Sequence, residues 1–487
     1  MNRSSVIWSV VRNWGQRLGS VITFFILVRL LTQEEIAIFA AAAAVMALLD
    51  LFTDNGLGDA MVQAKDTPAP LSTALFLINV AIACILYAGV LLFADPIAAL
   101  LGVDQATNVL MVAASVLLLN SLSFAPQAMM RKQFQFKRLA MRSLAATLLS
   151  AATGIIMAFA GLGVWAMVGQ LLVFSAVSAA MAWYPPVLRL ARPDFRGVRP
   201  LISFGSKIFA SRVLYYSSTR IISILLSIFF GPIALALYYM AVRLPAVLGQ
   251  LLVTVVTDLG LPQFSKLADD QEALANAFFS NLVFAAGISV PAFFALGALA
   301  PEITVLAFGA NGEGSAALLL PLALASAFQS VGTYNQIILN SRGMSGVSFW
   351  LSLANTTITT TIFFLARNTD LYTFINIYTA SQICLIPLYF YVGGLYSGIS
   401  FGRLLRVVYP YFTSATVALA AVWLARPLMR AEIPGLSDTP LIQSLILGCL
   451  LGLVFLFAYI ALLILLDRKA AIMIGKQFLV RRRRKQA

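Results

Sequence analysis

The sequence has no histidine and is poor in cysteine and in charged residues. Of its 487 residues, three are Cys and 11% are charged. The absence of His excludes His-based acid–base catalysis, His-containing triads and His-ligated metals. The three cysteines, Cys84, Cys384 and Cys449, lie far apart in apolar runs, so there is no disulfide framework and no CxxC pair. We expect no metal site and no cofactor.

The scarcity of charge also excludes a soluble globule. Soluble domains carry about 25% charged and about 45–50% apolar residues, whereas this chain is 61% hydrophobic. Many apolar runs approach the roughly 20 residues that cross a bilayer as a helix, and they lack the alternation of barrel strands. We therefore predict an all-α polytopic membrane protein with about 14 transmembrane helices. The predicted spans are 10–31, 36–56, 70–94, 106–128, 139–160, 163–184, 205–230, 232–257, 275–299, 316–340, 345–366, 371–395, 407–425 and 441–466.

Local motifs mark the expected helix ends. The segment 32–35 (TQEE) has the pattern of a capping box that opens the second span. The pairs Asp95-Pro96, Gly231-Pro232 and Pro434-Gly435 are typical helix breaks.

The distribution of Lys and Arg predicts the orientation. With an even number of spans both termini lie on one side, and most cations fall there, including the run Arg481–Lys485. By the positive-inside rule both termini are cytoplasmic. We interpret the net charge of +14 as topology and attraction to the anionic lipid bilayer, and we expect no nucleic-acid partner.

The chain resembles itself at an offset of about 200 residues, a sign of internal duplication. Residues 93–102 resemble 299–309, and residues 53–57 resemble 257–261, each pair at equivalent places in the predicted topology. We predict a six-helix lobe at 1–200, a second at 201–400, and two additional helices with a basic tail at 401–487. Two lobes around a central cleft are typical of alternating-access transporters; two lobes without transport is the alternative.

Charges inside predicted spans indicate a functional cleft. They concentrate in the opening pair of spans of each half, and we expect the other ten spans to carry essentially none beyond their edges. The intramembrane charges are Arg12, Arg17, Arg29, Asp50, Asp54, Arg212, Arg220 and Arg243. Six Arg against two Asp favour an anionic substrate, and the guanidinium fork suits phosphate. Snorkelling to the interface is the alternative, and it fits Arg12 and Arg29 better than Arg220 and Arg243.

Depth estimates place Arg17 level with Asp50, and Arg12 level with Asp54. These residues are candidates for helix pairing or for ion coupling. The neutral residues Gln329, Asn335, Gln336 and Asn355 of later spans are candidates for sugar contacts; hydrogen bonds between helices are the alternative.

Several segments of the first 310 residues or so resemble the bacterial polysaccharide-transport flippases, the Wzx-like exporters of lipid-linked oligosaccharides. They include 11–20 (VRNWGQRLGS), 29–39 (RLLTQEEIAIF), 48–65 (LLDLFTDNGLGDAMVQAK) and 134–137 (FQFK). The resemblance is closest to the WzxC and ExoT-like exopolysaccharide branch. Ala37 departs from the usual glycine of the family.

The resemblance implies the multidrug/oligosaccharidyl-lipid/polysaccharide exporter fold. It further implies a non-enzymatic flippase that moves an undecaprenyl-diphosphate-linked oligosaccharide across the bacterial cytoplasmic membrane for exopolysaccharide, capsule or O-antigen synthesis. The polymerase and export proteins of such a pathway would be partners. Within this hypothesis Arg220 and Arg243 bind the diphosphate, with Arg17 and Arg212 assisting.

Two rival functions remain open. A membrane glycosyltransferase or polymerase of the same pathway is disfavoured because the predicted outer loops are too short to build an acceptor site. A drug or metabolite antiporter of the same fold is disfavoured because a cation exporter needs carboxylates in its cleft, where this chain has arginines.

Overall fold

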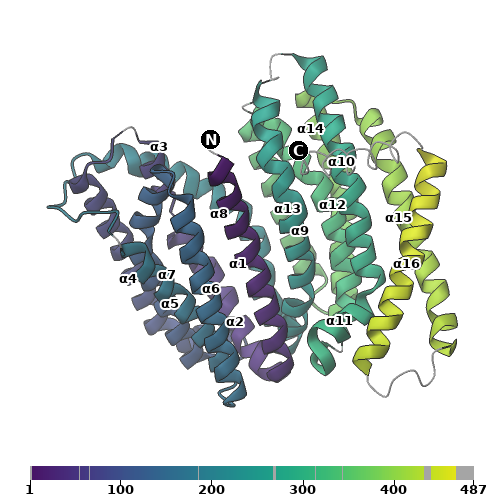
Figure 1. The fold of residues 1–487 in the computed structure, drawn as a ribbon, viewed down its shortest axis with the longest axis horizontal. Helices are drawn as coiled ribbons and strands as arrows, with labels where there is room; N and C mark the ends of the chain where they lie inside the picture. The colour runs from purple at the N-terminus through teal and green to yellow at the C-terminus, as the bar shows by residue number, and fades with distance from the viewer. Residues whose placement is uncertain are drawn as a thin grey trace. The chain divides into compact units, whose positions relative to one another are not determined.

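A computed structural model describes residues 3–53, 55–64, 66–184, 186–266, 270–312, 314–342, 344–432 and 440–467. In these ranges the chain is built from helices joined by short turns (Figure 1). Fourteen of the described helices are long, each overlapping one predicted span. They are α1 (Arg3–Leu30), α2 (Gln33–Thr53), α4 (Ala69–Leu100), α5 (Ala106–Lys132), α6 (Phe136–Phe159), α7 (Trp165–Trp183), α8 (Val198–Phe230), α9 (Pro232–Lys266), α10 (Gln271–Ala298), α12 (Ser315–Ser341), α13 (Ser345–Leu365), α14 (Leu371–Ser397), α15 (Phe401–Glu432) and α16 (Pro440–Leu466).

Short elements separate some of these helices: α3 (Leu57–Gln63), α11 (Ala300–Phe308) and the 3₁₀ turn η1 (Gly309–Gly312). Within the described residues, eleven helical segments are long and apolar enough to cross a membrane. Helices α1 and α13 fall outside that set: arginines lower the hydropathy of α1, and Thr, Ser and Asn lower that of α13. The all-α polytopic fold is therefore confirmed.

The chain divides into two compact units, 1–239 and 240–487. In the first unit α1 packs along α6, α4 along α5, and α8 against α2 and α3. In the second unit α10 packs against α12 and α15, α12 against α14, and α15 along α16. The lobes 1–200 and 201–400, and the appended segment 401–487, stay a prediction.

The seam between α15 and α16 explains why the last two spans form a pair. Along α15 the residues Tyr411, Ala415, Ala418 and Val422 are buried at intervals of three and four, the spacing of one helical face. The same buried cluster contains residues of α16 that repeat every four positions: Leu447, Leu451, Phe455, Tyr459 and Leu463. Small residues on α15 let the two backbones approach closely, as is usual for helices packed in a membrane.

Two of the predicted helix boundaries are confirmed in atomic detail. Thr32 N donates to Glu35 Oε2 at 2.8 Å, and Glu35 N donates to Thr32 Oγ1 at 3.2 Å, which is a capping box. Gly231, at φ 85°, ends α8, and Pro232 begins α9. Pro434 and Gly435 lie outside the described residues.

The boundary expected at Asp95-Pro96 is wrong. Pro96 lies inside α4, which continues to Leu100. Proline removes one backbone hydrogen bond, but membrane helices tolerate that loss because neighbouring groups satisfy the freed carbonyl. The helix then ends before Gly102, whose φ of 71° parallels the 62° of Gly309 at the equivalent place in the second half.

The duplicated segments 53–57 and 257–261 differ in backbone conformation. In the first half α2 stops at Thr53, and Gly56 adopts a left-handed conformation before α3. Asn79 Nδ2 donates to the carbonyl of Thr53 at 2.9 Å, and Leu57 N donates to Asn55 Oδ1 at 3.2 Å. In the second half α9 runs on to Lys266, so 257–261 does not close its helix. Leucine stands there in place of Asn55 and has no side-chain acceptor for the backbone.

Candidate functional site

The predicted cationic site falls on α1, α8 and α9. Arg17 on α1 and Arg243 on α9 are half-buried, and both engage other residues. Arg212 and Arg220 lie on the described backbone of α8, but their side chains, like that of Arg12, are outside the described residues. Arg17 belongs to the first unit and Arg243 to the second, so a joint cleft stays a prediction.

Of the two predicted intramembrane acids, Asp50 is described. It lies near the end of α2, where its side chain is exposed in the protein and engages another residue. Asp54 lies outside the described residues. An exposed carboxylate on a spanning helix faces water or a polar partner, because lipid would make its charge very costly.

A buried arginine on α6 was missed by sequence reasoning. Arg142 is only 7% exposed, and its Nη1 donates to the carbonyl of Ser178 on α7 at 3.3 Å. One turn earlier, Arg138 Nη2 donates to the carbonyl of Ala182 at 3.5 Å. Arg142 is the fourth residue of the predicted span 139–160, and its burial is what the sequence alone did not indicate. Cations beside the last turn of a helix complement its dipole, so this pair has a structural role at the end of α7.

Helix α12 separates its polar residues between two faces. Gln329 is exposed and Gln336 is half-buried, seven residues apart and thus on one side of the helix. Asn335 is 4% exposed, and its Nδ2 donates to the carbonyl of Tyr389 on α14 at 2.8 Å. The accessible face of α12 is therefore polar although the helix is apolar enough to span a membrane.

A second polar contact joins α13 and α14. Gln382 of α14 is 2% exposed, and its Nε2 donates to Asn355 Oδ1 at 3.3 Å and to Thr359 Oγ1 at 3.5 Å. Asn355 keeps a half-buried side chain. These bonds hold the polar helix α13, which lies outside the eleven apolar segments, against its neighbour.

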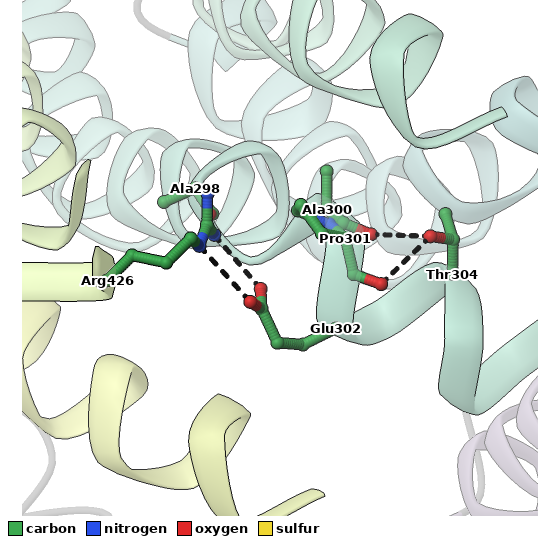
Figure 2. A network of polar contacts seen from close by, with 6 residues as sticks. All are labelled: Ala298, Ala300, Pro301, Glu302, Thr304 and Arg426. Carbon is green, nitrogen blue, oxygen red and sulfur yellow. Dashed lines mark hydrogen bonds and ion pairs between the residues drawn. The ribbon is translucent and has the colours of Figure 1, made fainter. Parts of the chain in front are cut away.

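A buried ion pair connects the last two helices to the rest of the second unit. Glu302 opens α11 and Arg426 lies on α15, each just beyond a predicted span, 275–299 and 407–425 respectively. Arg426 Nε donates to Glu302 Oε1 at 3.1 Å and Nη2 donates to Oε2 at 3.0 Å, and Figure 2 shows this forked contact. Nη2 also donates to the carbonyl of Ala298 at 2.5 Å.

The side chain of Glu302 is 2% exposed and that of Arg426 is 17% exposed. Both charges are therefore largely removed from solvent, and each has its hydrogen-bonding partner. The acidic residue at the equivalent place in the first half, Asp95, is exposed. The Glu302–Arg426 pair therefore lies where α15 and α16 pack against the other helices of the second unit. The sequence indicates this ion pair only weakly, because a hydropathy profile shows Glu302 and Arg426 as two separate charges near the ends of spans.

The described part of the chain contains no cluster of His, Cys, Asp and Glu placed to hold a metal ion. Among the described candidate site residues, Arg17 and Arg243 supply guanidinium groups and Gln329 and Gln336 supply amides. Such groups bind anionic and hydroxyl-rich molecules by hydrogen bonding and charge.

Comparison with known proteins identifies the family. Residues 26–317, more than half of the chain, match the model of the polysaccharide biosynthesis protein family. The chain belongs to this family. The match covers α2 to α11 completely, including the capping box, the α2–α3 break and the α5–α6 turn.

Curated relatives of this family member act in the synthesis of different polymers. The chain is 25% identical to the succinoglycan biosynthesis transport protein ExoT of Rhizobium meliloti, covering 73% of this chain and 72% of that protein. It is 24% identical to the lipopolysaccharide biosynthesis protein WzxC of Escherichia coli, covering 68% of each. The teichuronic acid biosynthesis protein TuaB of Bacillus subtilis is 20% identical over 71% of this chain and 72% of its own length.

Solved structures share the fold. The lipid II flippase MurJ, in an inward closed conformation, matches with a TM-score of 0.71 and 13% identity, covering 94% of this chain and all of that one. An inward-facing multidrug resistance transporter of the MATE family and the MOP superfamily matches with a TM-score of 0.58 and 16% identity, covering 80% and 98%. The predicted exporter fold is confirmed.

Proposed function

We propose that this protein is a flippase that moves an undecaprenyl-diphosphate-linked oligosaccharide from the inner to the outer leaflet of the bacterial cytoplasmic membrane. The observation that carries the proposal is membership of a polysaccharide biosynthesis family by a chain built from membrane-spanning helices. The relatives named as transport and lipopolysaccharide proteins, and the lipid II flippase fold, support the same substrate class.

The diphosphate is the group that Arg220 and Arg243 bind, with Arg17 and Arg212 assisting. Guanidinium groups in a low-dielectric cavity bind phosphate through paired, charge-assisted hydrogen bonds. The oligosaccharide lies against the polar face of α12 that carries Gln329 and Gln336, with Asn355 on α13 as a further candidate. The fourth predicted residue, Asn335, instead links α12 to α14. The polyprenyl tail remains in the bilayer while the two lobes alternate.

The acidic residues in the spans of the first lobe couple transport to an ion gradient. Asp50 or Asp54 takes up an ion, or pairs with Arg17 or Arg12 to hold α1 and α2. The protein performs no covalent chemistry in this account. Both termini lie in the cytoplasm, and the polymerase and export proteins of the same polysaccharide pathway receive the translocated unit.

A deletion strain tests the function. Lipid-linked oligosaccharides are extracted, and their exposure at the outer face of spheroplasts is measured with an added glycan-binding probe. Complete repeat units trapped in the inner leaflet are the expected result. Complete units that reach the outer face without being polymerised would instead identify a polymerase, and unaltered lipid-linked intermediates would favour a drug or metabolite antiporter.

A further inference from the structure

The turn between α5 and α6 has an unusual backbone. Phe134 adopts φ 56°, and among the described residues no other non-glycine residue has a positive φ. Bulky side chains rarely occupy this left-handed region. Such an outlier persists only when the surrounding structure holds it, and it commonly marks a functional position.

Two backbone hydrogen bonds hold the turn. Gln135 N donates to the carbonyl of Met130 at 2.9 Å, and Phe134 N donates to the carbonyl of Arg131 at 3.1 Å. This is a Schellman motif, in which the left-handed position normally carries glycine. Glycine would fit this backbone better than phenylalanine, so the local fold does not account for the aromatic ring.

The ring of Phe134 points away from the protein core. It is 68% exposed, and its centroid lies 6.1 Å from that of Phe136 in an edge-to-face contact. Phe136 packs against the buried cluster of Met130, Leu139 and Ala182. One ring is thus anchored in the protein, while the other is presented at the surface.

Four cations flank the turn, in two roles. Lys132 Nζ donates to the carbonyl of Ala64 at 2.7 Å and to Thr67 Oγ1 at 3.0 Å, and Arg138 binds the end of α7, so these two fasten the turn. Arg131 and Lys137, each three residues from Phe134, are exposed.

Among the described residues, the contacts of the exposed cations are loose. Arg131 Nη1 lies 3.5 Å from Asp59 Oδ1, with 44% of its side chain exposed. Lys137 Nζ lies 5.7 Å from the centroid of the Trp8 ring. An exposed ion pair of this kind contributes little to stability, so both cations remain available to an anion.

The turn must lie at the surface of the bilayer, because α5 and α6 are both apolar enough to span it and three residues join them. We propose that Phe134, Arg131 and Lys137 form a binding site for the phosphate of an anionic phospholipid headgroup. The ring enters the boundary between headgroups and acyl chains, and the two cations contact the phosphate. This site is separate from the transport function proposed above.

A tryptophan at the turn tests the site directly. Phe134→Trp protein is reconstituted in vesicles that contain either brominated phosphatidylglycerol or brominated phosphatidylcholine at the same mole fraction, with the parent protein as background. We expect stronger quenching by the anionic lipid. The preference should fall by about fivefold for each of Arg131→Gln and Lys137→Gln, the effect of one cation near an anionic surface.

Phe159→Trp is the matched control, because Phe159 is 73% exposed at the opposite end of α6 and has no basic residue in the adjoining turn. It should be quenched equally by both lipids. Equal quenching at position 134 would overturn the proposal. Preferential displacement of brominated phosphatidylglycerol by a small amount of undecaprenyl diphosphate would overturn the assignment to phospholipid.

Phe134→Gly supplies a second readout that does not depend on a probe. Glycine adopts the left-handed conformation at little cost, so the turn should keep its fold. If the ring is a lipid contact, the rise in unfolding temperature caused by phosphatidylglycerol shrinks in this variant. An undiminished rise would show that phenylalanine is merely tolerated at the turn.

Discussion

Arg220 is the residue on which the substrate hypothesis depends most. Arg220→Ala should lower export by about 10-fold to 100-fold, because hydrogen bonds to a charged group contribute about 1.5–3 kcal/mol. The measurement is the rate of polysaccharide export at matched membrane levels. Arg367→Ala is the control, since Arg367 is exposed in the loop after α13. Unchanged export by Arg220→Ala would remove this residue from the site.

Neighbouring amides on α12 should behave differently because they face different surroundings. Asn335 bonds to the carbonyl of Tyr389, and a Cβ at Gly393 would meet its side chain at 2.0 Å, so no space surrounds it. Asn335→Ala should cost about 1 kcal/mol of stability, measured as a lower unfolding temperature in detergent. Gln336→Ala should leave that temperature unchanged and slow export. The reverse pattern would contradict this division of roles.

At the scale of elements, the ion pair between α11 and α15 predicts strong coupling. Arg426→Met leaves a buried carboxylate without its partner, and Glu302→Leu leaves a buried guanidinium without its partner. Each substitution should lower the free energy of unfolding by about 3–5 kcal/mol. The double variant should recover most of that loss, since two apolar side chains fill the space without unpaired charge. Thermal unfolding of the four proteins gives the coupling energy, and additive losses would argue against a bond between the two.

The break between α2 and α3 depends on close backbone contact with α8. A Cβ at Gly205 would lie 3.2 Å from the carbonyl carbon of Gly56 and 3.3 Å from the oxygen of Asn55. Gly205→Val should therefore destabilise the protein by about 1–3 kcal/mol through overpacking. Gly89→Ala on α4 is the matched control, because no atom lies within 4 Å of its added Cβ. Equal unfolding temperatures for the two variants would contradict the contact.

Some of these elements could be predicted from the sequence, and others could not. The fourteen long helices follow from hydropathy, because lipid requires long apolar segments whose backbone bonds are internal. The capping box followed from its local pattern. The helix boundary predicted at Pro96 was wrong because the rule that proline ends a helix applies to helices in water. The ion pair of Glu302 with Arg426 could not be predicted, because it joins segments 124 residues apart that no local pattern connects.

At the scale of the whole molecule, the functional account depends on the predicted internal repeat and on the places where its two halves differ. Gly102 and Gly309 turn the chain at equivalent places with the same sign of φ, as a duplicated architecture predicts. The copies diverge where the first half breaks a helix at Gly56 and where the second half accepts α15 and α16. The repeat stays a prediction from the sequence, and the packing that distinguishes its two halves follows from individual side chains such as Asn55 and Glu302.

The central claim is that this protein moves a diphosphate-linked oligosaccharide between leaflets. The most direct test uses purified protein in vesicles that carry a radiolabelled undecaprenyl-diphosphate oligosaccharide, with a membrane-impermeant glycosidase added outside. In protein-free vesicles only the outer half of the label is accessible. The account predicts that the protein makes nearly all of it accessible and that Arg220→Ala slows this exchange. Accessibility that stays at half with correctly folded parent protein would contradict the account.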